Sequence, residues 1–148
     1  MQVVEVDAAA CLDLRRRVLR AGTPSTDPCF AEDDRPDTFH LAAVADGRVL
    51  GVVTFTSQPL ASRPDASAAQ LRGMATEPEA RGTGAGRVVF EAGVERLRAA
   101  GYTVLWAKAR DTALGFYERM GMHAEGDGYV TAETGLPHHT VVLDLTMS

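Results

Sequence analysis

A glycine-rich segment, Arg81-Gly82-Thr83-Gly84-Ala85-Gly86, constrains this chain more than any other feature of its sequence. A strand-like run at residues 69–76 and a Pro-bearing turn precede it, and a helix-like run from Arg87 to Ala100 follows it. Glycines at alternate positions at a helix start leave backbone N–H groups unpaired and let a ligand approach the main chain closely. Those donors, together with the positive end of the helix dipole, suit a pyrophosphate. The segment therefore predicts a site for a phosphorylated cofactor, with Arg81 as an adjacent cation.

The spacing of these glycines disfavours two other kinds of nucleotide site. A P-loop requires Gly-x-x-x-x-Gly-Lys-Ser/Thr, and no lysine follows the glycines here. A dinucleotide site requires Gly-x-Gly-x-x-Gly directly after the first strand of a βαβ unit. In this chain the spacing is Gly-x-Gly-x-Gly, and several strand-like runs come first. A nucleotide-binding protein that uses the loop for another phosphate ligand remains an alternative.

The segment resembles the Arg/Gln-x-x-Gly-x-Gly/Ala motif of the GNAT superfamily of N-acetyltransferases, with Arg81, Gly84 and Gly86 at the defining places. A second block, Ala-Leu-Gly-Phe-Tyr-Glu-Arg-Met-Gly-Met at residues 113–122, resembles the family element Ala-x-x-Phe-Tyr-Glu-x-x-Gly-Phe. It follows the expected strand at residues 104–107. The resemblance implies acetyl-CoA as the cofactor and acetyl donor, and it carries no information about the acceptor.

Composition limits the class of protein. With 148 residues and 45% hydrophobic content, we expect residues 1–148 to form a single domain. The net charge of −5 argues against nucleic acid as a partner. No apolar run approaches the ~20 residues that span a bilayer, and the N-terminus lacks a signal-peptide core, so we expect no membrane association and a cytoplasmic location. Cys11 and Cys29 form no Cys-x-x-Cys pair, which favours two reduced thiols.

Hydrophobic periodicity and turn signals predict the elements. We expect strands over residues 2–6, 39–45, 48–56, 69–76, 104–107, 129–130 and 140–145, and helices over residues 8–20, 87–100 and 112–121. Asp46-Gly47 is a strong hairpin signal, Gly101 is a candidate C′ residue, and Asp111 is a candidate N-cap. This order predicts an α+β fold, a sheet flanked by helices. The resemblance implies a mixed, mainly antiparallel sheet whose two central parallel strands splay apart to hold CoA.

The resemblance also assigns cofactor-binding positions. They are Met74, Ala75 and Thr76 at the strand end, Arg81, Gly82, Thr83, Gly84, Ala85, Gly86 and Arg87 in the loop, and Ala113 and Phe116 in the second block. The strand-end backbone would bind the pantetheine arm and polarise the carbonyl, as it does in the family. Without the nearby loop, these three residues are typical of an ordinary buried strand end.

Tyr117 matches the family tyrosine that donates a proton to the CoA thiolate. A phenol with a pKa of ~10 protonates a thiolate whose conjugate acid is near ~8.5 only uphill, so a hydrogen-bonded assist is the alternative. Phe116 and Tyr117 are otherwise typical of aromatic core residues. Many family members carry Asn where this chain has Arg110, which would reach the CoA phosphates or pair with Asp111.

The general base is harder to assign, because Gln70 and Arg72 occupy the positions where relatives often carry a Glu. Glu77 either orders a water or is a solvated turn residue. Histidines titrate near neutral pH, and the chain has His40, His123, His138 and His139. We prefer His138 as a catalytic residue, since the resemblance places its loop near the acceptor side, with a surface-loop histidine as the alternative. His138 and His139 are adjacent without a third ligand, so we expect no metal.

The acidic residues Glu32, Asp33, Asp34 and Asp37 either favour a cationic acceptor, such as a polyamine or aminoglycoside, or are solvated loop charge. The function implied is acetyl transfer from acetyl-CoA to a primary amine of a small molecule or peptide, by direct attack in a ternary complex. The alternative is a non-catalytic acyl-CoA-binding or sensing module. The missing strand carboxylate favours that alternative, and Tyr117 counts against it. Family members often dimerise, and the edge of a late strand would supply a homodimer interface.

Overall fold

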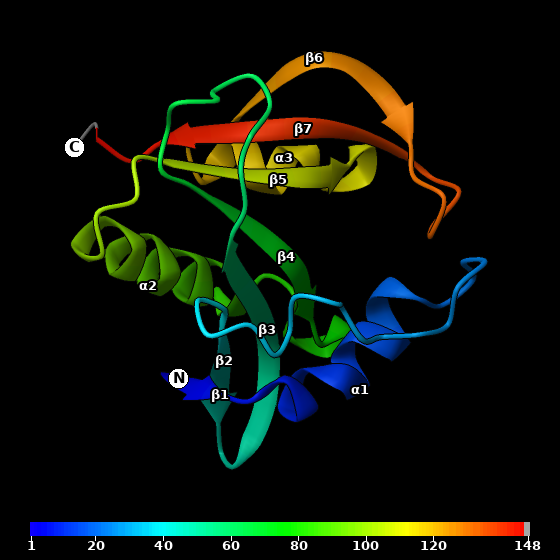
Figure 1. The fold of residues 1–148 in the computed structure, drawn as a ribbon. Helices are drawn as coiled ribbons and strands as arrows, with labels where there is room; N and C mark the ends of the chain where they lie inside the picture. The colour runs from blue at the N-terminus through cyan, green and yellow to red at the C-terminus, as the bar shows by residue number, and fades with distance from the viewer. Residues whose placement is uncertain (147–148) are drawn as a thin grey trace.

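The protein is built on one mixed sheet with the strand order β1-β2-β3-β4-β5-β7-β6 (Figure 1). The structure is a computed structural model and describes residues 1–146. Every neighbouring pair of strands is antiparallel except β4 and β5, which are parallel. The strands are β1 (Gln2–Val6), β2 (Phe39–Ala45), β3 (Arg48–Ser57), β4 (Ala68–Thr76), β5 (Val104–Arg110), β6 (His123–Val130) and β7 (Pro137–Asp144). The predicted α+β fold with a mainly antiparallel sheet is confirmed.

Helical segments connect and cover the strands. They are η1 (Ala8–Cys11), α1 (Leu12–Leu14), η2 (Arg15–Leu19), η3 (Pro78–Ala80), α2 (Ala85–Ala99), η4 (Asp111–Ala113) and α3 (Leu114–Arg119). The expected helix over residues 8–20 is thus one irregular helix, in which a 3₁₀ turn leads into α1 and a π-helical turn follows it. No helix of residues 1–146 is long and apolar enough to cross a membrane.

The two faces of the sheet are covered by different helices. Side chains alternate between the faces of a strand, so Val53 and Phe55 of β3 face the core under α2, whereas Val52 packs with α1. Figure 1 shows α2 and α1 on either side of β3. A Cβ at Gly93 of α2 would lie 2.1 Å from the Phe55 ring, so glycine at this position allows α2 to pack closely on the sheet.

Two local predictions are confirmed by backbone geometry. Asp46 and Gly47 have φ of 52° and 74°, as a type I′ turn requires, and they join β2 to β3. Gly101 has φ of 94°. Its N–H donates to the Arg98 carbonyl, and the Tyr102 N–H donates to the Leu97 carbonyl. This pair of bonds is a Schellman motif that ends α2.

The opening expected between two central strands is present. β4 and β5 pair only from Ala68 to Gln70 of β4 and from Val104 to Trp106 of β5. Beyond Gln70, the register of β4 against β3 shifts at a bulge, and Gly73 takes a φ of 63°. β5 instead continues straight along β7 as far as Arg110. The bulge bends β4 away from β5, and the two strands separate.

Several predicted boundaries are wrong. α2 begins at Ala85, before the expected Arg87, since Gly84 takes the left-handed N-cap conformation and the next residues are already helical. β6 starts at His123 and β7 at Pro137, so both strands are longer than predicted. Most of β6 is exposed at the sheet edge, so hydrophobic alternation could not mark it.

Candidate active site

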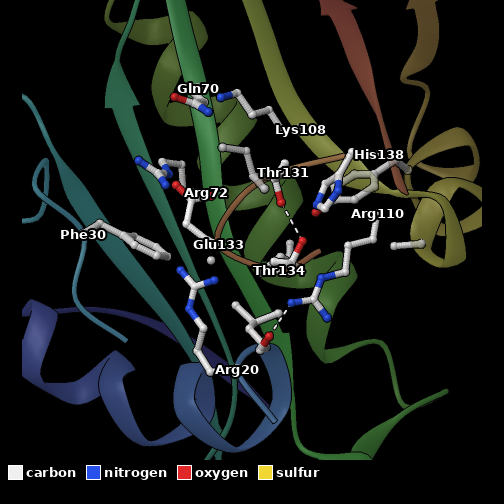
Figure 2. A pocket seen from close by; sticks show the side chains of 16 residues that line it. Arg20, Phe30, Gln70, Arg72, Lys108, Arg110, Thr131, Glu133, Thr134 and His138 are labelled. Atoms are coloured by element: carbon white, nitrogen blue, oxygen red, sulfur yellow. Dashed lines mark hydrogen bonds between the residues drawn. The ribbon is translucent and has the colours of Figure 1, made fainter. Parts of the chain in front are cut away.

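The opening between β4 and β5 leads into a cleft of about 150 Å³ (Figure 2). Its lining comes from five parts of the chain that are distant in sequence. The lining residues are Leu19, Arg20 and Phe30, then Gln70, Leu71, Arg72, Gly73 and Met74 of β4, Lys108 and Arg110 of β5, Ala113 and Tyr117 near α3, and Thr131, Glu133, Thr134 and His138 of the β6–β7 hairpin. The cleft therefore joins the sheet to α3 through the gap between the parallel strands.

Strand alternation places the polar side chains on the face of the sheet that lies away from α2. Ala107 and Ala109 of β5 are buried in the core with α2, so Lys108 and Arg110 point to the opposite face. Residues paired across strands share a face, and Arg110 pairs with His138 of β7. Tyr117 reaches the cleft from α3. The cleft is thus lined both by polar side chains from the face away from α2 and by Tyr117 from the face that α2 covers.

Tyr117, a predicted catalytic residue, is 7% exposed and packs edge-on against Phe116 with ring centroids 5.2 Å apart. Burial raises the pKa of Tyr117, and the positive charge of Arg110 offsets only part of that effect. The phenol is therefore neutral at ordinary pH and acts as a hydrogen-bond donor. Tyr117 is thus part of the core under α2 and also of the cleft wall.

His138, the other predicted catalytic residue, lies in β7 and is 5% exposed, so its interpretation as a surface-loop histidine is wrong. Its Nδ1 lies 2.8 Å from the carbonyl oxygen of Leu136. A carbonyl only accepts, so Nδ1 carries the proton, and the neutral ring keeps its lone pair on Nε2. The ring of Tyr129 stacks on the imidazole at a centroid distance of 6.1 Å. These two contacts fix the tautomer and the plane of the ring.

No carboxylate of β4 lines the cleft. Gln70 and Arg72 do line it, as expected, and Arg72 forms an ion pair with Glu32 at 2.7 Å. Glu77 is only 6% exposed and pairs with Arg17, so its interpretation as a solvated turn residue is wrong. The hydrogen bond from Arg17 lowers the pKa of Glu77. The Glu77 carboxylate is therefore held in an ion pair, and it does not line the cleft.

The glycine loop is open on the side where a ligand would lie. Gly82 and Gly84 have φ of 83° and 92°, and a Cβ at either would meet no atom within 4 Å. Within residues 1–146, their N–H groups donate to no backbone carbonyl. Those of Ala85, Gly86 and Arg87 belong to the first turn of α2, where no partner exists within the helix. The loop therefore presents a row of free donors at a helix start.

The strand end, the loop and the second block come together as the sequence predicts. A Cβ at Gly86 would lie 3.2 Å from the Phe116 ring and 3.5 Å from Thr76 Oγ1. Met74 and Ala113 line the cleft, and Ala75 is buried. The side chains of Arg81, Thr83 and Arg87 in the loop are exposed. The Thr83 hydroxyl donates to the Ala80 carbonyl, and Arg87 forms an ion pair with Glu91.

Arg110 and Asp111 have other partners than those expected. The Arg110 guanidinium donates to the carbonyl of Leu19, which ties β5 to the end of η2. Burial lowers the pKa of Arg110. The Asp111 carboxylate accepts from His139 Nδ1 at 2.7 Å, so it does not cap the following helical turn. Arg110 therefore fixes one side of the cleft, and Asp111 links η4 to β7 outside the cleft.

The acidic loop residues do not line the cleft. Glu32 is neutralised by Arg72, and Asp33 pairs at 2.8 Å with Arg15, which is fully buried. Asp34 and Asp37 do not line the cleft.

The charged side chains of Arg20, Lys108 and Glu133 also line the cleft, and none of them is predicted from the sequence. An isolated charged residue is usually solvated, so no sequence pattern marks these three as site residues. Residues 1–146 contain no group of three or more His, Cys, Asp or Glu side chains that could hold a metal ion.

Comparisons with known proteins agree with this architecture. The Acetyltransferase (GNAT) family matches residues 9–122, so the chain belongs to that family of acetyltransferases. The uncharacterized N-acetyltransferase YitI of Bacillus subtilis (strain 168) is 27% identical over 142 residues, which cover 96% of this chain and 94% of that protein. The resemblance inferred from the glycine loop and the second block is thereby confirmed.

Solved structures share the fold. A putative N-acetyltransferase from Lactobacillus plantarum superposes with a TM-score of 0.77 at 21% identity, covering 97% of each chain. An aminoglycoside 6′-N-acetyltransferase complexed with coenzyme A superposes with a TM-score of 0.71 at 14% identity, covering 98% of this chain and 97% of that one. At these identities the likeness concerns the fold.

Proposed function

We propose that this protein transfers an acetyl group from acetyl-CoA to an amine, by direct attack of the amine in a ternary complex. The observation that carries the proposal is the cleft through the sheet, which joins His138 on one face to Tyr117 on the other. Phe116, the neighbour of Tyr117, lies against Gly86 of the glycine loop. An acyl donor and an amine would reach the same point from opposite faces. Orientation of this kind makes a bimolecular encounter effectively unimolecular, which is a large part of catalysis.

The glycine loop is suited to the pyrophosphate of CoA. The free N–H groups of Gly82 and of Ala85 to Arg87 converge at the positive end of α2, and the open side of Gly84 leaves room for phosphate oxygens. A related GNAT fold has been solved with coenzyme A, which supports the assignment. Arg81 and Arg87 would add charge at the rim.

The free edge of β4 is suited to the pantetheine arm. Beyond Gln70, β4 has no strand partner on its β5 side, so its backbone groups there are available to a ligand. Met74 lines the cleft, and Ala75 and Thr76 continue the strand toward the loop. A backbone N–H in this stretch would stabilise the negative charge that develops on the thioester oxygen.

When bound, acetyl-CoA supplies the acetyl group as a thioester. His138 Nε2, which has the free lone pair, would take the proton that the amine loses as its C–N bond forms and the C–S bond breaks. Tyr117 would then donate a hydrogen bond to the departing thiolate. Because burial raises the pKa of Tyr117, the phenol is a weaker acid than usual, and it stabilises the thiolate by a hydrogen bond while solvent supplies the proton.

The alternative, a non-catalytic acyl-CoA-binding or sensing module, is favoured by the absence of a β4 carboxylate from the cleft. Two measurements separate the functions. Acetyl-CoA and CoA, but not NAD or ATP, should raise the melting temperature, since only a bound ligand stabilises by mass action. A panel of amines, read by mass, should contain acetylated products only if the protein is an enzyme. Binding without any acetylated amine would favour the sensing module.

A further inference from the structure

The lining of the cleft is basic, although the protein as a whole carries a net charge of −5. Its cationic side chains are Arg20, Arg72, Lys108 and Arg110, and among residues 1–146 its one carboxylate is that of Glu133. Figure 2 shows these side chains around the same opening, with the Arg20 guanidinium directed into it. The charge of this site is thus opposite in sign to that of the molecule.

Only one of these cations is neutralised by a nearby carboxylate. Arg72 has its ion pair with Glu32. The other two arginines donate to backbone carbonyls: Arg110 to that of Leu19, and Arg20 Nε to that of Asp27 at 3.1 Å. A carbonyl accepts a hydrogen bond but does not cancel a formal charge.

Lys108 has no hydrogen bond or ion pair within the described chain, residues 1–146. Glu133 likewise has no ion pair there, and it can offset only one positive charge. The cleft therefore keeps uncompensated positive charge from Arg20, Lys108 and Arg110. A charge of this sign attracts an anionic ligand and repels a cationic one.

The surplus charge does not face the loop proposed for the CoA pyrophosphate. Lys108 and Arg110 point away from α2, as the burial of Ala107 and Ala109 against α2 requires. The glycine loop, in contrast, lies at the N-terminal end of α2. The cations therefore face the side from which the acceptor would enter.

We propose that the acceptor is an amine that also carries an anionic group, a carboxylate or a phosphate, which Arg20 and Lys108 bind while the amine lies at His138. The inference rests on the proposed function. A cleft of about 150 Å³ is small beside the ~300–1,000 Å³ of drug-sized ligand sites. The part of the acceptor that enters is therefore small, as a free amino acid is. Polyamines and aminoglycosides would be repelled by the same charge.

The test uses matched acceptors with the full-length protein. Each α-amino acid is compared with its carboxamide and with the amine that lacks the carboxylate, and O-phosphoethanolamine is compared with ethanolamine. Spermine and an aminoglycoside represent polycations. We expect kcat/KM for the carboxylate or phosphate member to exceed that of its neutral partner by about tenfold or more, as loss of a charged hydrogen bond predicts. The two anionic arms show which group is preferred.

Variants show whether the named cations are responsible. Lys108→Met should raise KM for the anionic acceptor by about tenfold and reduce its preference over the neutral partner, while the Kd for acetyl-CoA stays unchanged. Lys108→Arg should retain the preference. Arg20→Met should likewise raise KM for the anionic acceptor and reduce the preference for it. Arg16→Met is the matched control, since Arg16 is exposed on η2 outside the cleft and should leave KM unchanged.

The outcomes separate this inference from the proposed function. If acetyl-CoA binds and neutral or polycationic amines are acetylated best, the enzyme assignment stands and the anionic acceptor is wrong. If acetyl-CoA binds but no anionic amine reacts or adds to the thermal stability of the complex, the anionic acceptor is likewise wrong, and the remaining amines of the panel decide the enzyme assignment. If acetyl-CoA itself does not bind, the proposed function is wrong. An unchanged preference in Lys108→Met and Arg20→Met would overturn the roles of these cations.

Discussion

His138 and Leu136 are joined by a hydrogen bond in which the imidazole Nδ1 donates to the main-chain carbonyl oxygen over 2.8 Å. This bond fixes the tautomer of a ring that is otherwise enclosed by β7 and by the stacked ring of Tyr129. In the proposed reaction, the unprotonated Nε2 would be the atom that meets the acceptor amine. A histidine held in this way is equipped to remove a proton, whereas a core histidine with both nitrogens bonded is not.

The first prediction concerns proton removal. His138→Ala should lower kcat/KM by about 10²-fold or more, because the variant lacks the imidazole that would accept the amine proton. His139→Ala is the matched control, because the adjacent imidazole bonds to Asp111 and points to the other side of β7. An unchanged rate in His138→Ala would assign proton removal to an ordered water.

The second prediction concerns the leaving group. Tyr117→Phe should lower kcat by about 10-fold or more and leave the Kd for acetyl-CoA nearly unchanged, since the hydroxyl acts as charge reaches sulfur and the ring packs in both proteins. Single-turnover kinetics and a direct binding titration separate the two quantities. Equal turnover of the two proteins would return Tyr117 to a purely structural role against Phe116.

The third prediction concerns the glycine loop. Gly84→Val should strongly weaken acetyl-CoA binding, because its branched side chain would occupy the open space where phosphate must approach the backbone. The strain of a side chain at φ of 92° also costs about 1–2 kcal/mol, so the fold is not left untouched. Gly101→Val is the matched control: Gly101 has φ of 94° and equally open surroundings, but it ends α2. Both variants should lose similar stability, and only Gly84→Val should lose binding. Equal acetyl-CoA affinity in the two would place the cofactor elsewhere.

The features of the fold and site that depend on a few adjacent residues could be predicted from the sequence. A glycine loop and the Asp46-Gly47 turn depend on the conformations of a few adjacent residues, and both are where the sequence predicts them. Tyr117 and Met74 lie at the cleft for the same reason, since they follow recognisable elements.

The remaining parts depend on pairings between distant residues, which no local pattern encodes. Arg15 occupies a helical position like its neighbours, yet it is fully buried by Asp33 and Thr54. Arg20 and Lys108 line the same cleft only because the end of η2 and strand β5 both border it. His138 was expected in a loop, because the exposed, glycine-containing strand β6 that pairs with it has no hydrophobic alternation.

The fourth prediction concerns the loop that forms one wall of the cleft. Arg15 binds Asp33 through both guanidinium nitrogens, at 2.8 and 3.0 Å, and holds Phe30 beneath its guanidinium at 4.0 Å. Asp33→Asn removes the charge and leaves Arg15 buried without its counter-ion, which should cost about 3 kcal/mol at neutral pH. Equilibrium urea unfolding measures this loss. An unchanged midpoint would mean that the pair does not stabilise the loop.

The same variant has a defined pH dependence. Burial alone would raise the pKa of Asp33, but the bonds from Arg15 and from the Phe30 N–H outweigh it and lower that pKa. A carboxyl whose pKa is lower in the folded protein stabilises it above the unfolded value of ~3.9 and loses this effect as pH falls through the folded pKa. The stability difference between wild type and Asp33→Asn should therefore be full at neutral pH and shrink below about pH 4.

Acetyl transfer from acetyl-CoA to an amine is tested most directly by following a labelled acetyl group. The protein is incubated with acetyl-CoA carrying ¹³C in the acetyl group and with a panel of amines, and both the free CoA thiol and the products are quantified. We predict one labelled N-acetyl product for each thiol released, and no release above background without an amine. Thiol release without a labelled amine, or no amine-dependent reaction across the panel despite tight acetyl-CoA binding, would contradict acetyl transfer to an amine by this protein.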